Sequence, residues 1–442
     1  MSSYTPTNQT LIEDYEQLKE IILKGAKPKS EWSIGTEHEK LGWSTSEHRQ
    51  PPYGGPNGIG VLLKHFTSEG WVPTFEGSAI IALSKNGANL TLEPGGQFEL
   101  SGAPLKTLAE MSREVDDHLL DMSRLSANLG LIWSGLGSSD VPPSLTPKMP
   151  KARYEIMRSY LPQKGKLALH MMHSTCTIQA NLDFLDAQDA MKKLRAALYL
   201  QPLVMAMFAN SFLLDNQLRP GSSARSQIWL NTDPDRYLYP ASFLAENTPL
   251  DAYIDWAVSV PMFFIARDGQ YLNCTGLPFS TFLKEGYQGH QATLGDFELH
   301  LSTLFPDARL KQFLEVRGAD MGPSSYIKAL PAWHVGLLYD DLNLDRVINH
   351  FEGISAEQLW ETRARLDQEG LDTPLGDRPL IEWAQECTQW AREGVLRYES
   401  ESAHLLNPLI DNLNFKRCPA DLYRPLWEKG GTEAVRKASQ VS

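Results

Sequence analysis

The sequence contains few cysteines and none of the spacings that cysteine-based sites use. Its four cysteines, Cys176, Cys274, Cys387 and Cys418, lie far apart and form no CxxC pair. Disulfide frameworks and zinc ribbons need closely spaced or paired cysteines. The cysteine pattern therefore predicts no structural zinc site and is typical of a reducing compartment, so we expect a cytoplasmic location.

The sequence also lacks a segment that would direct it to a membrane. The first residues, MSSYTPTNQTLIEDYEQ, are acidic and show no basic stretch followed by an apolar run, unlike signal and transit peptides. The longest apolar stretch, residues 198–212, is interrupted by Gln201, Pro202 and Asn210 and is too short to span a bilayer. Lys and Arg number 41 against 54 Asp and Glu, which disfavours nucleic acid. We expect neither a membrane nor nucleic acid as a partner.

Common nucleotide and hydrolase motifs are absent as well. The glycine-rich segment 54–60 is not followed by Lys and Ser or Thr, so the chain has no P-loop, and no GxGxxG follows a strand. The pair His38-Glu39 does not extend to HExxH, because residue 42 is glycine, and no GxSxG occurs. A nucleotide would have to bind by another route, such as metal ions and basic side chains on a sheet.

What the sequence does contain is enough apolar material for a large core. The chain has 442 residues, of which 42% are hydrophobic, and 11 tryptophans, a composition unlike that of disordered chains. Apolar periodicity predicts helices over 11–24, 107–129, 187–212 and 380–398, and a capping box at Ser355 and Gln358 opens another. No repeat or linker divides the chain. We expect residues 1–442 to form one integrated catalytic domain.

Five short segments alternate polar and apolar residues, which is the period of a β-strand. The odd-numbered residues of each segment share one face, and those faces are polar. The segments are residues 33–39 (SIGTEHE), 89–101 (NLTLEPGGQFELS, with a turn at 94–96), 175–183 (TCTIQANLD), 225–231 (RSQIWLN) and 313–317 (FLEVR). An alternating strand usually means only a sheet with one solvated face.

The identity of the polar residues argues for more than a solvated face. Glutamate recurs on these faces, at Glu37, Glu39, Glu93, Glu99 and Glu315. Glutamate is depleted in strands, and like charges on neighbouring strands repel. If these carboxylates converge, they need cations, and oxygen ligands select hard ions such as Mg²⁺ or Mn²⁺.

Arginines and amides occupy the same faces, namely Arg225, Arg317, Gln179, Asn181 and Gln227. Carboxylates with arginines around a hard metal ion are the equipment of phosphoryl transfer. We therefore expect Arg317 and Arg225 to be catalytic and to bind substrate or nucleotide, together with Gln227 and Asn181. The alternative for Arg317 is a plain ion pair with Glu315.

The segments GTEHEK, LEPGGQFELSGAP, TCTIQANLDF, RSQIWLNTD and LEVRGAD, in this order, closely resemble the plant-type glutamate–cysteine ligases of plants and many proteobacteria. The resemblance runs from about Glu31 to at least Tyr339. It implies a glutamine-synthetase-like α+β fold, with a curved, mostly antiparallel sheet. Helices would cover its outer face, and the active site would lie on the polar concave face.

The resemblance also implies the reaction and the roles of residues. In that family ATP phosphorylates the γ-carboxylate of glutamate, and the amine of cysteine then displaces the phosphate, which is the first step of glutathione biosynthesis. The cofactor would be Mg²⁺, or Mn²⁺, and the enzyme a monomer or homodimer. By motif position, the implied metal ligands are Glu37, Glu39, Glu93, Glu99, Glu315 and Gln179.

Three other readings remain open from the sequence. Another carboxylate–amine ligase would share the metal-centre motifs, because these serve ATP rather than the acceptor. A metal-dependent hydrolase could also use clustered carboxylates, although the arginines and the lack of histidine ligands disfavour it. A binding protein without activity would have to retain five repelling carboxylates for no purpose.

Overall fold

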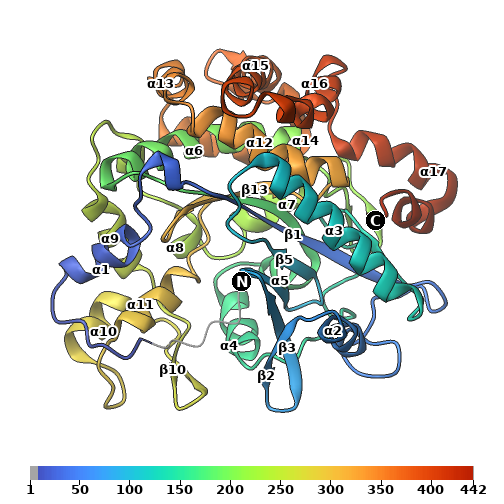
Figure 1. Ribbon diagram of the computed structural model, residues 1–442, viewed down its shortest axis with the longest axis horizontal. Coiled ribbons are helices and arrows are strands. Elements are labelled where there is room, and N and C mark those ends of the chain that lie inside the picture. Colours follow the sequence, from blue (N-terminus) through green and yellow to red (C-terminus); the bar gives the residue numbers. More distant parts are fainter. Residues whose placement is uncertain (1–7, 442) are drawn as a thin grey trace.

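The structure is a computed structural model that describes residues 8–441. Its central element is a nine-stranded sheet in the order β12-β13-β7-β1-β5-β4-β3-β2, with β6 also paired to β1, and every one of these pairings is antiparallel (Figure 1). In chain order the strands are β1 (Ile34–Ser44), β2 (Val72–Glu76), β3 (Ala79–Lys85), β4 (Ala88–Leu92), β5 (Phe98–Ser101), β6 (Leu131–Ser134), β7 (Thr177–Leu182), β12 (Ala308–Leu310) and β13 (Leu314–Asp320). The predicted α+β class with a large antiparallel sheet is confirmed.

The register brings the predicted polar faces together. Strand β1 lies between β5 and β7, so that Glu37 is opposite Ser101 on one side and Gln179 on the other. Glu39 is opposite Glu99. Because side chains alternate along each strand, these residues share one face of the sheet. The prediction of strands is confirmed for residues 33–39, 89–101, 175–183 and 313–317.

The fifth predicted strand is wrong, because residues 225–231 fall in a helix, α7 (Ala224–Leu230). Within it Gln227 and Leu230 are only partly covered, and the buried residues are Ala224, Arg225, Ser226, Ile228 and Trp229. Arg225, Ile228 and Trp229 follow the i, i+3, i+4 spacing of one helix face. A segment of only seven residues can show this spacing and the alternation of a strand at the same time.

Helices cover the apolar face of the sheet. Helices α6 and α12 contact β7, β12 and β13, α3 contacts β1 and β6, and α15 packs on the outside of α12 (Figure 1). The capping boxes at Thr107 and Ser355 are present, and Pro202 lies inside α6 as expected. The helices are α1 (Glu16–Leu23), α2 (Ile59–Ser68), α3 (Leu108–Ala127), α4 (Arg153–Tyr160), α5 (Ala168–Ser174), α6 (Ala187–Met207), α8 (Pro234–Tyr237), α9 (Leu250–Ser259), α10 (Phe279–Glu285), α11 (Leu294–Leu301), α12 (Ser324–Leu338), α13 (Asp341–His350), α14 (Ala356–Glu369), α15 (Leu380–Tyr398), α16 (Asn407–Asn414) and α17 (Pro419–Ala438), besides α7.

Three two-stranded hairpins stand apart from the sheet: β8 (Leu213–Leu214) with β9 (Gln217–Leu218), β10 (Phe264–Arg267) with β11 (Gln270–Asn273), and β14 (Pro374–Leu375) with β15 (Arg378–Pro379). Within residues 8–441, no helix has the length and apolar character that crossing a membrane requires.

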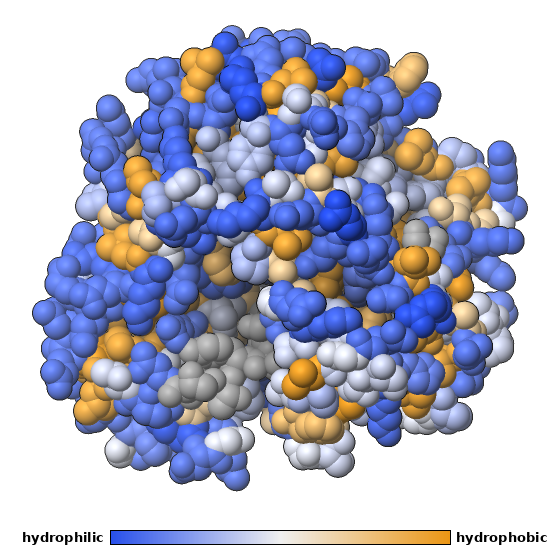
Figure 2. All heavy atoms as spheres, viewed as in Figure 1, coloured by the Kyte–Doolittle hydropathy of each residue, from blue (hydrophilic) through white to orange (hydrophobic). Residues whose placement is uncertain are grey.

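The molecular surface in Figure 2 is mostly hydrophilic, with apolar residues scattered over it. The apolar residues gather instead behind the sheet, where Ile34, Ile178 and Leu182 are fully buried.

Candidate active site

A cavity of about 640 Å³ lies over the polar face of the sheet. Alternate residues of β7 and its flanks line it, from Thr175 through Thr177, Gln179 and Asn181 to Asp183. At a rise of about 3.3 Å per residue this row is roughly 26 Å long. We call the two ends of the cavity the Thr175 end and the Asp183 end.

The carboxylates of β1 lie in the middle of the cavity. Asn181 Nδ2 donates to Glu37 Oε1 over 2.9 Å, and the backbone N–H of Thr177 donates to Glu39 Oε2 over 3.1 Å. Burial, reinforced by Glu315 and Glu99, raises the pKa of Glu37 to about 7. Burial, then Glu99, raises the pKa of Glu39 well above its usual value. The two neighbouring carboxylates therefore strongly favour a cation beside them.

Glu315 on β13 is in the opposite electrostatic situation. Its carboxylate receives Arg309 Nη2 at 2.5 Å, Arg317 Nη1 at 2.6 Å and Lys311 Nζ at 3.0 Å. Burial alone would raise the pKa of Glu315, but these three cations outweigh burial and hold the pKa well below its usual range. Arg317 Nη1 also donates to Gln179 Oε1 over 2.9 Å. Gln179 and Glu315 thus fix the direction of the Arg317 guanidinium.

Glu93 and Glu99 occupy different depths. Glu93, at the turn between β4 and β5, lines the cavity, and Tyr154 Oη lies 3.5 Å from its Oε1. Glu99 is opposite Glu39 but is fully buried and is not part of the cavity wall; Thr91 Oγ1 donates to it over 2.7 Å. The five glutamates therefore share one face of the sheet, as predicted, without all reaching the cavity surface.

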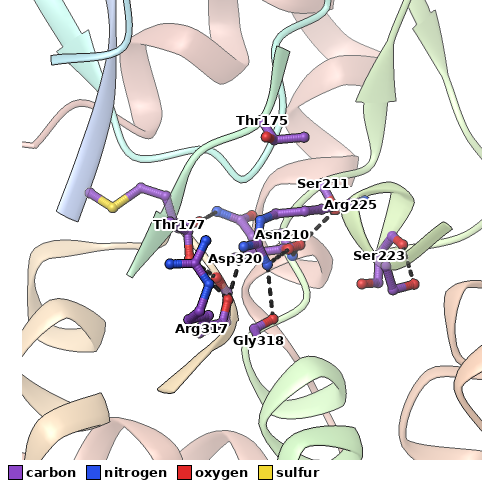
Figure 3. Close-up of polar contacts among 12 residues, drawn as sticks. Thr175, Thr177, Asn210, Ser211, Ser223, Arg225, Arg317, Gly318 and Asp320 are labelled. Carbon is purple, nitrogen blue, oxygen red and sulfur yellow. Dashed lines mark hydrogen bonds and ion pairs between the residues drawn. The ribbon is translucent and has the colours of Figure 1, made fainter. Parts of the chain in front are cut away.

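Arg225 reaches the site from α7, and its guanidinium is committed to the main chain (Figure 3). It donates to the carbonyls of Arg317 at 2.9 Å and Gly318 at 3.0 Å, where the pairing of β13 with β7 shifts register in a β-bulge. Ser211 Oγ accepts from the Arg225 backbone N–H and donates to Asp320 at 2.6 Å. Arg225 lines the cavity, but its present contacts hold the strand that carries Arg317.

Of the remaining predicted residues, Asn181 and Gln179 line the cavity and Gln227 does not. Gln227 Nε2 donates to the carbonyl of Ala364 on α14 over 2.9 Å. The reason is the misread segment, because a helix directs residues 225 and 227 to different sides whereas a strand would place them together.

Sequence reasoning missed several basic residues of the site. Arg309 and Lys311 alternate with Leu310, so the same period-2 test applied to residues 308–311 would have found them. Lys27 at the Asp183 end pairs with Asp183 at 2.9 Å. Lys151 and Arg153, just before and at the start of α4, are buried in the field of Glu93; burial and then Arg153 lower the pKa of Lys151 to about 7. No pattern in the sequence marks that segment.

The described residues, 8–441, contain no group of three or more His, Cys, Asp or Glu side chains placed to hold a metal ion. The chemistry of the donors nevertheless suits a hard cation, because the Glu37 and Glu39 carboxylates, with raised pKa values, are oxygen ligands close to one another. Glu315 suits one less well, since three protein cations already neutralise it.

Two solved structures share the fold of this chain. A glutamate–cysteine ligase from Francisella tularensis, solved with AMP, superposes with a TM-score of 0.56 at 12% identity, over 92% of this chain and 87% of that one. A bifunctional glutathione synthetase from Pasteurella multocida gives a TM-score of 0.50 at 11% identity, over 96% of this chain and 52% of that one. At these identities the likeness concerns the fold alone.

Sequence comparison then gives the family. The family model described as glutamate-cysteine ligase family 2 matches residues 33–423. The chloroplastic glutamate–cysteine ligase of Medicago truncatula is 38% identical over 94% of this chain and 83% of its own length, and that of Nicotiana tabacum is 38% identical over 93% and 80%. Glutamate–cysteine ligase B of rice is 37% identical over 94% and 85%. The chain belongs to glutamate–cysteine ligase family 2.

The same relatives overturn the expected cytoplasmic location. The Medicago, tobacco, rice and Arabidopsis proteins are all named chloroplastic. Scattered cysteines indicate only a lack of disulfides, and a stretch without a targeting pattern is weak ground for a compartment. The prediction of a cytoplasmic location was wrong.

Proposed function

We propose that the protein is an ATP-dependent ligase that joins the γ-carboxylate of glutamate to the amine of cysteine through γ-glutamyl phosphate, giving γ-glutamylcysteine, ADP and phosphate. This reaction is the first step of glutathione biosynthesis. The observation that carries the proposal is that Glu37, Glu39 and Arg317 line one cavity, in a chain whose relatives are named glutamate–cysteine ligases. The substrates are the small molecules glutamate, cysteine and ATP.

In this proposal Arg317 stabilises the phosphoryl group as it is transferred. A guanidinium held in one direction by Gln179 and Glu315 can meet developing phosphate charge without reorganising. Arg225 supports it through the backbone of β13 and faces the same cavity. Asn181, which donates to Glu37, is proposed to bind substrate or nucleotide. Gln227 has the weakest case for that role, because its amide donates to the carbonyl of Ala364.

We further propose Mg²⁺, or Mn²⁺ in its place, as the cofactor. Glu37, Glu39 and Glu93, which line the cavity, would hold it, with Glu99 behind them and Glu315 and Gln179 at the edge of the set. When bound, the ion would neutralise the carboxylates and polarise phosphate oxygens. The raised pKa values of Glu37 and Glu39 support this assignment, since a nearby cation would stabilise the charged forms that burial and neighbouring carboxylates disfavour.

We propose that residues 1–442 act as one catalytic unit, as a monomer or a homodimer. The polar face of the sheet supports this, because its strands span the chain from Ile34 in β1 to Asp320 in β13. Sedimentation would distinguish the two assemblies.

Phosphate release tests the reaction. With ATP, Mg²⁺ and glutamate, the protein should release little phosphate, and cysteine should raise the rate strongly because the acyl phosphate awaits an amine. The product should be γ-glutamylcysteine by mass. Faster turnover with ammonia or another amine at equal concentration would contradict the acceptor and favour a different carboxylate–amine ligase. Phosphate release without any amino acid would favour a hydrolase.

A further inference from the structure

The two ends of the cavity differ in chemistry. Three methionines and a tryptophan line the Thr175 end: Met157, Met171, Met172 and Trp229. They come from α4, α5 and α7 and belong to one apolar cluster. Lysines line the Asp183 end, at Lys24, Lys27 and Lys311, next to Gly25 and Phe313. A single cavity thus offers a soft apolar wall at one end and a basic wall at the other.

The indole of Trp229 lacks a partner that a buried donor needs. Trp229 is 8% exposed, and its Nε1–H has no hydrogen-bond acceptor among residues 8–441. An unmet buried donor costs free energy, and such exceptions concentrate where a ligand or water completes the bond. Because Trp229 lines the cavity, a bound molecule with an acceptor oxygen can provide what the protein does not.

Charges around this end suit a zwitterion. The Arg225 guanidinium lies 5.8 Å from the Trp229 ring centre, so that positive charge and the free N–H are near each other. The β4–β5 turn that carries Glu93 is fixed to α5, because Gln97 Nε2 donates to the carbonyls of Met172 at 3.2 Å and Thr175 at 3.0 Å. An ammonium group would lie near Glu93, and a carboxylate would meet the Trp229 N–H with the positive charge of Arg225 nearby.

The three substrates of the proposed reaction make different demands. The phosphates of ATP and the extra carboxylate of glutamate need cations, which Lys24, Lys27 and Lys311 supply towards the Asp183 end. The side chain of cysteine is small, uncharged and polarisable, and methionine sulfur suits such a group. Of the three, cysteine fits the Thr175 end best.

We propose that the Thr175 end is the acceptor subsite. Met157, Met171 and Met172 contact the thiol, and Trp229 donates its indole N–H to the α-carboxylate of cysteine. This inference rests on the proposed function and adds to it the residues that choose the acceptor. Trp229 and Met172 are then specificity-determining residues.

Trp229→Phe tests the carboxylate contact, because it removes the N–H and keeps an aromatic ring. The KM for cysteine should rise on the order of tenfold, the effect of losing a hydrogen bond to a charged group, while the KM values for glutamate and ATP stay within about twofold. Cysteamine has the same amine and thiol but no carboxylate, so its KM should not change between wild type and variant. Trp256→Phe is the matched control, since Trp256 is also 8% exposed but does not line the cavity.

Each other result overturns the inference. A raised KM for ATP would place the adenine at this end, and a raised KM for glutamate would place the donor there. An equal rise for cysteine and cysteamine would mean that the ring, not the N–H, is what matters. No change for any substrate would remove Trp229 from the site.

Met172→Ala tests the thioether wall independently. It opens space near a thiol, so homocysteine, with one more methylene, should gain at least about fivefold in kcat/KM relative to cysteine. An unchanged ratio in a variant that still melts cooperatively would refute the wall. If wild type released no phosphate in response to cysteine, the proposed function itself would fail, a result distinct from all of these.

Discussion

Two strands of the same sheet, β13 and β1, carry cavity-lining carboxylates in opposite electrostatic surroundings. On β13, Glu315 is surrounded by Arg309, Lys311 and Arg317, all from residues 309–317. On β1, Glu37 and Glu39 receive only an amide and a backbone N–H among their hydrogen-bond donors in the described residues, and their pKa values rise. Three cations of the protein neutralise the first carboxylate, whereas the two on β1 lie where burial and neighbouring carboxylates favour their protonated forms.

The difference separates two roles of these glutamates that the alternating sequence pattern could not distinguish. Glu315 looks like its neighbours in the pattern, yet its contacts are those of a residue that fixes an arginine. The β1 pair has raised pKa values, which the proposed cation would offset. Variants on the two strands should therefore change stability in opposite directions.

The largest effect is expected at Glu315. Glu315→Gln leaves three cations without their anion in a buried place, which typically costs about 3–5 kcal/mol of unfolding free energy. Denaturant unfolding of the metal-free protein measures it. A loss below about 1 kcal/mol, the worth of an exposed ion pair, would mean that the Glu315 cluster is solvated and the comparison with β1 is false.

Glu37 should show the opposite sign, visible in the pH dependence of stability. Its pKa is about 7 folded and near 4.5 unfolded, so folding takes up a proton between these values. Stability should therefore fall as pH rises from about 4.5 through 7, by up to about 3 kcal/mol. In metal-free protein Glu37→Gln should abolish this component and be the more stable form at pH 8. Equal slopes in wild type and variant would contradict the shift.

Arg317→Lys asks whether the arginine on β13 does more than neutralise Glu315. Lysine keeps the charge but loses the planar fork that grips phosphate oxygens. We expect kcat to fall on the order of 100-fold, about 2.7 kcal/mol of transition-state stabilisation, with a smaller change in glutamate affinity. Steady-state kinetics beside Arg397→Lys, an exposed ion-pair control, measures it. Near-normal kcat would leave only the ion pair.

Gly318→Ala should have the smallest effect, and it tests how β13 is held. A Cβ at Gly318 would lie 2.3 Å from Gln201 Oε1, the atom that accepts the Gly318 N–H at 2.9 Å. We expect a cost of about 1–3 kcal/mol in stability and a loss of kcat larger than the loss of ATP affinity. A neutral result in both melt and kinetics would show that the bulge adapts freely.

Sequence periodicity predicted much of the polar face of the sheet, because the alternation of side chains along a strand depends only on residues next to one another in the sequence. Glu37, Gln179 and Asn181 could be assigned to one face from their spacing alone, and the sheet register then joined them. The helix at residues 224–230 could not be recognised, since seven residues satisfy either period. The ion pairs of Glu315 could not be predicted either. They depend on the pairing of β12 with β13, which places Arg309 opposite Glu315.

The residues that sequence analysis did not identify at all carry no periodic signal. Lys151 and Arg153 lie just before and at the start of α4, buried near Glu93 but outside the cavity wall, and Trp229 lines the cavity from a helix that was predicted as a strand. Their importance follows from burial beside charge, which only the folded chain reveals.

The β-bulge at Arg317 and Gly318 has a consequence for how such a site can vary. An extra residue in a strand normally reverses every side chain beyond it, yet here β7 resumes its pairing at Ala319. The distortion is confined to one step. Arg225 and Gln201 hold it from helices outside the sheet, and Thr177 holds it from the neighbouring strand β7. Residues of α6 and α7 thus hold the main chain beneath Arg317, while Gln179 and Glu315, on the strands themselves, direct its guanidinium.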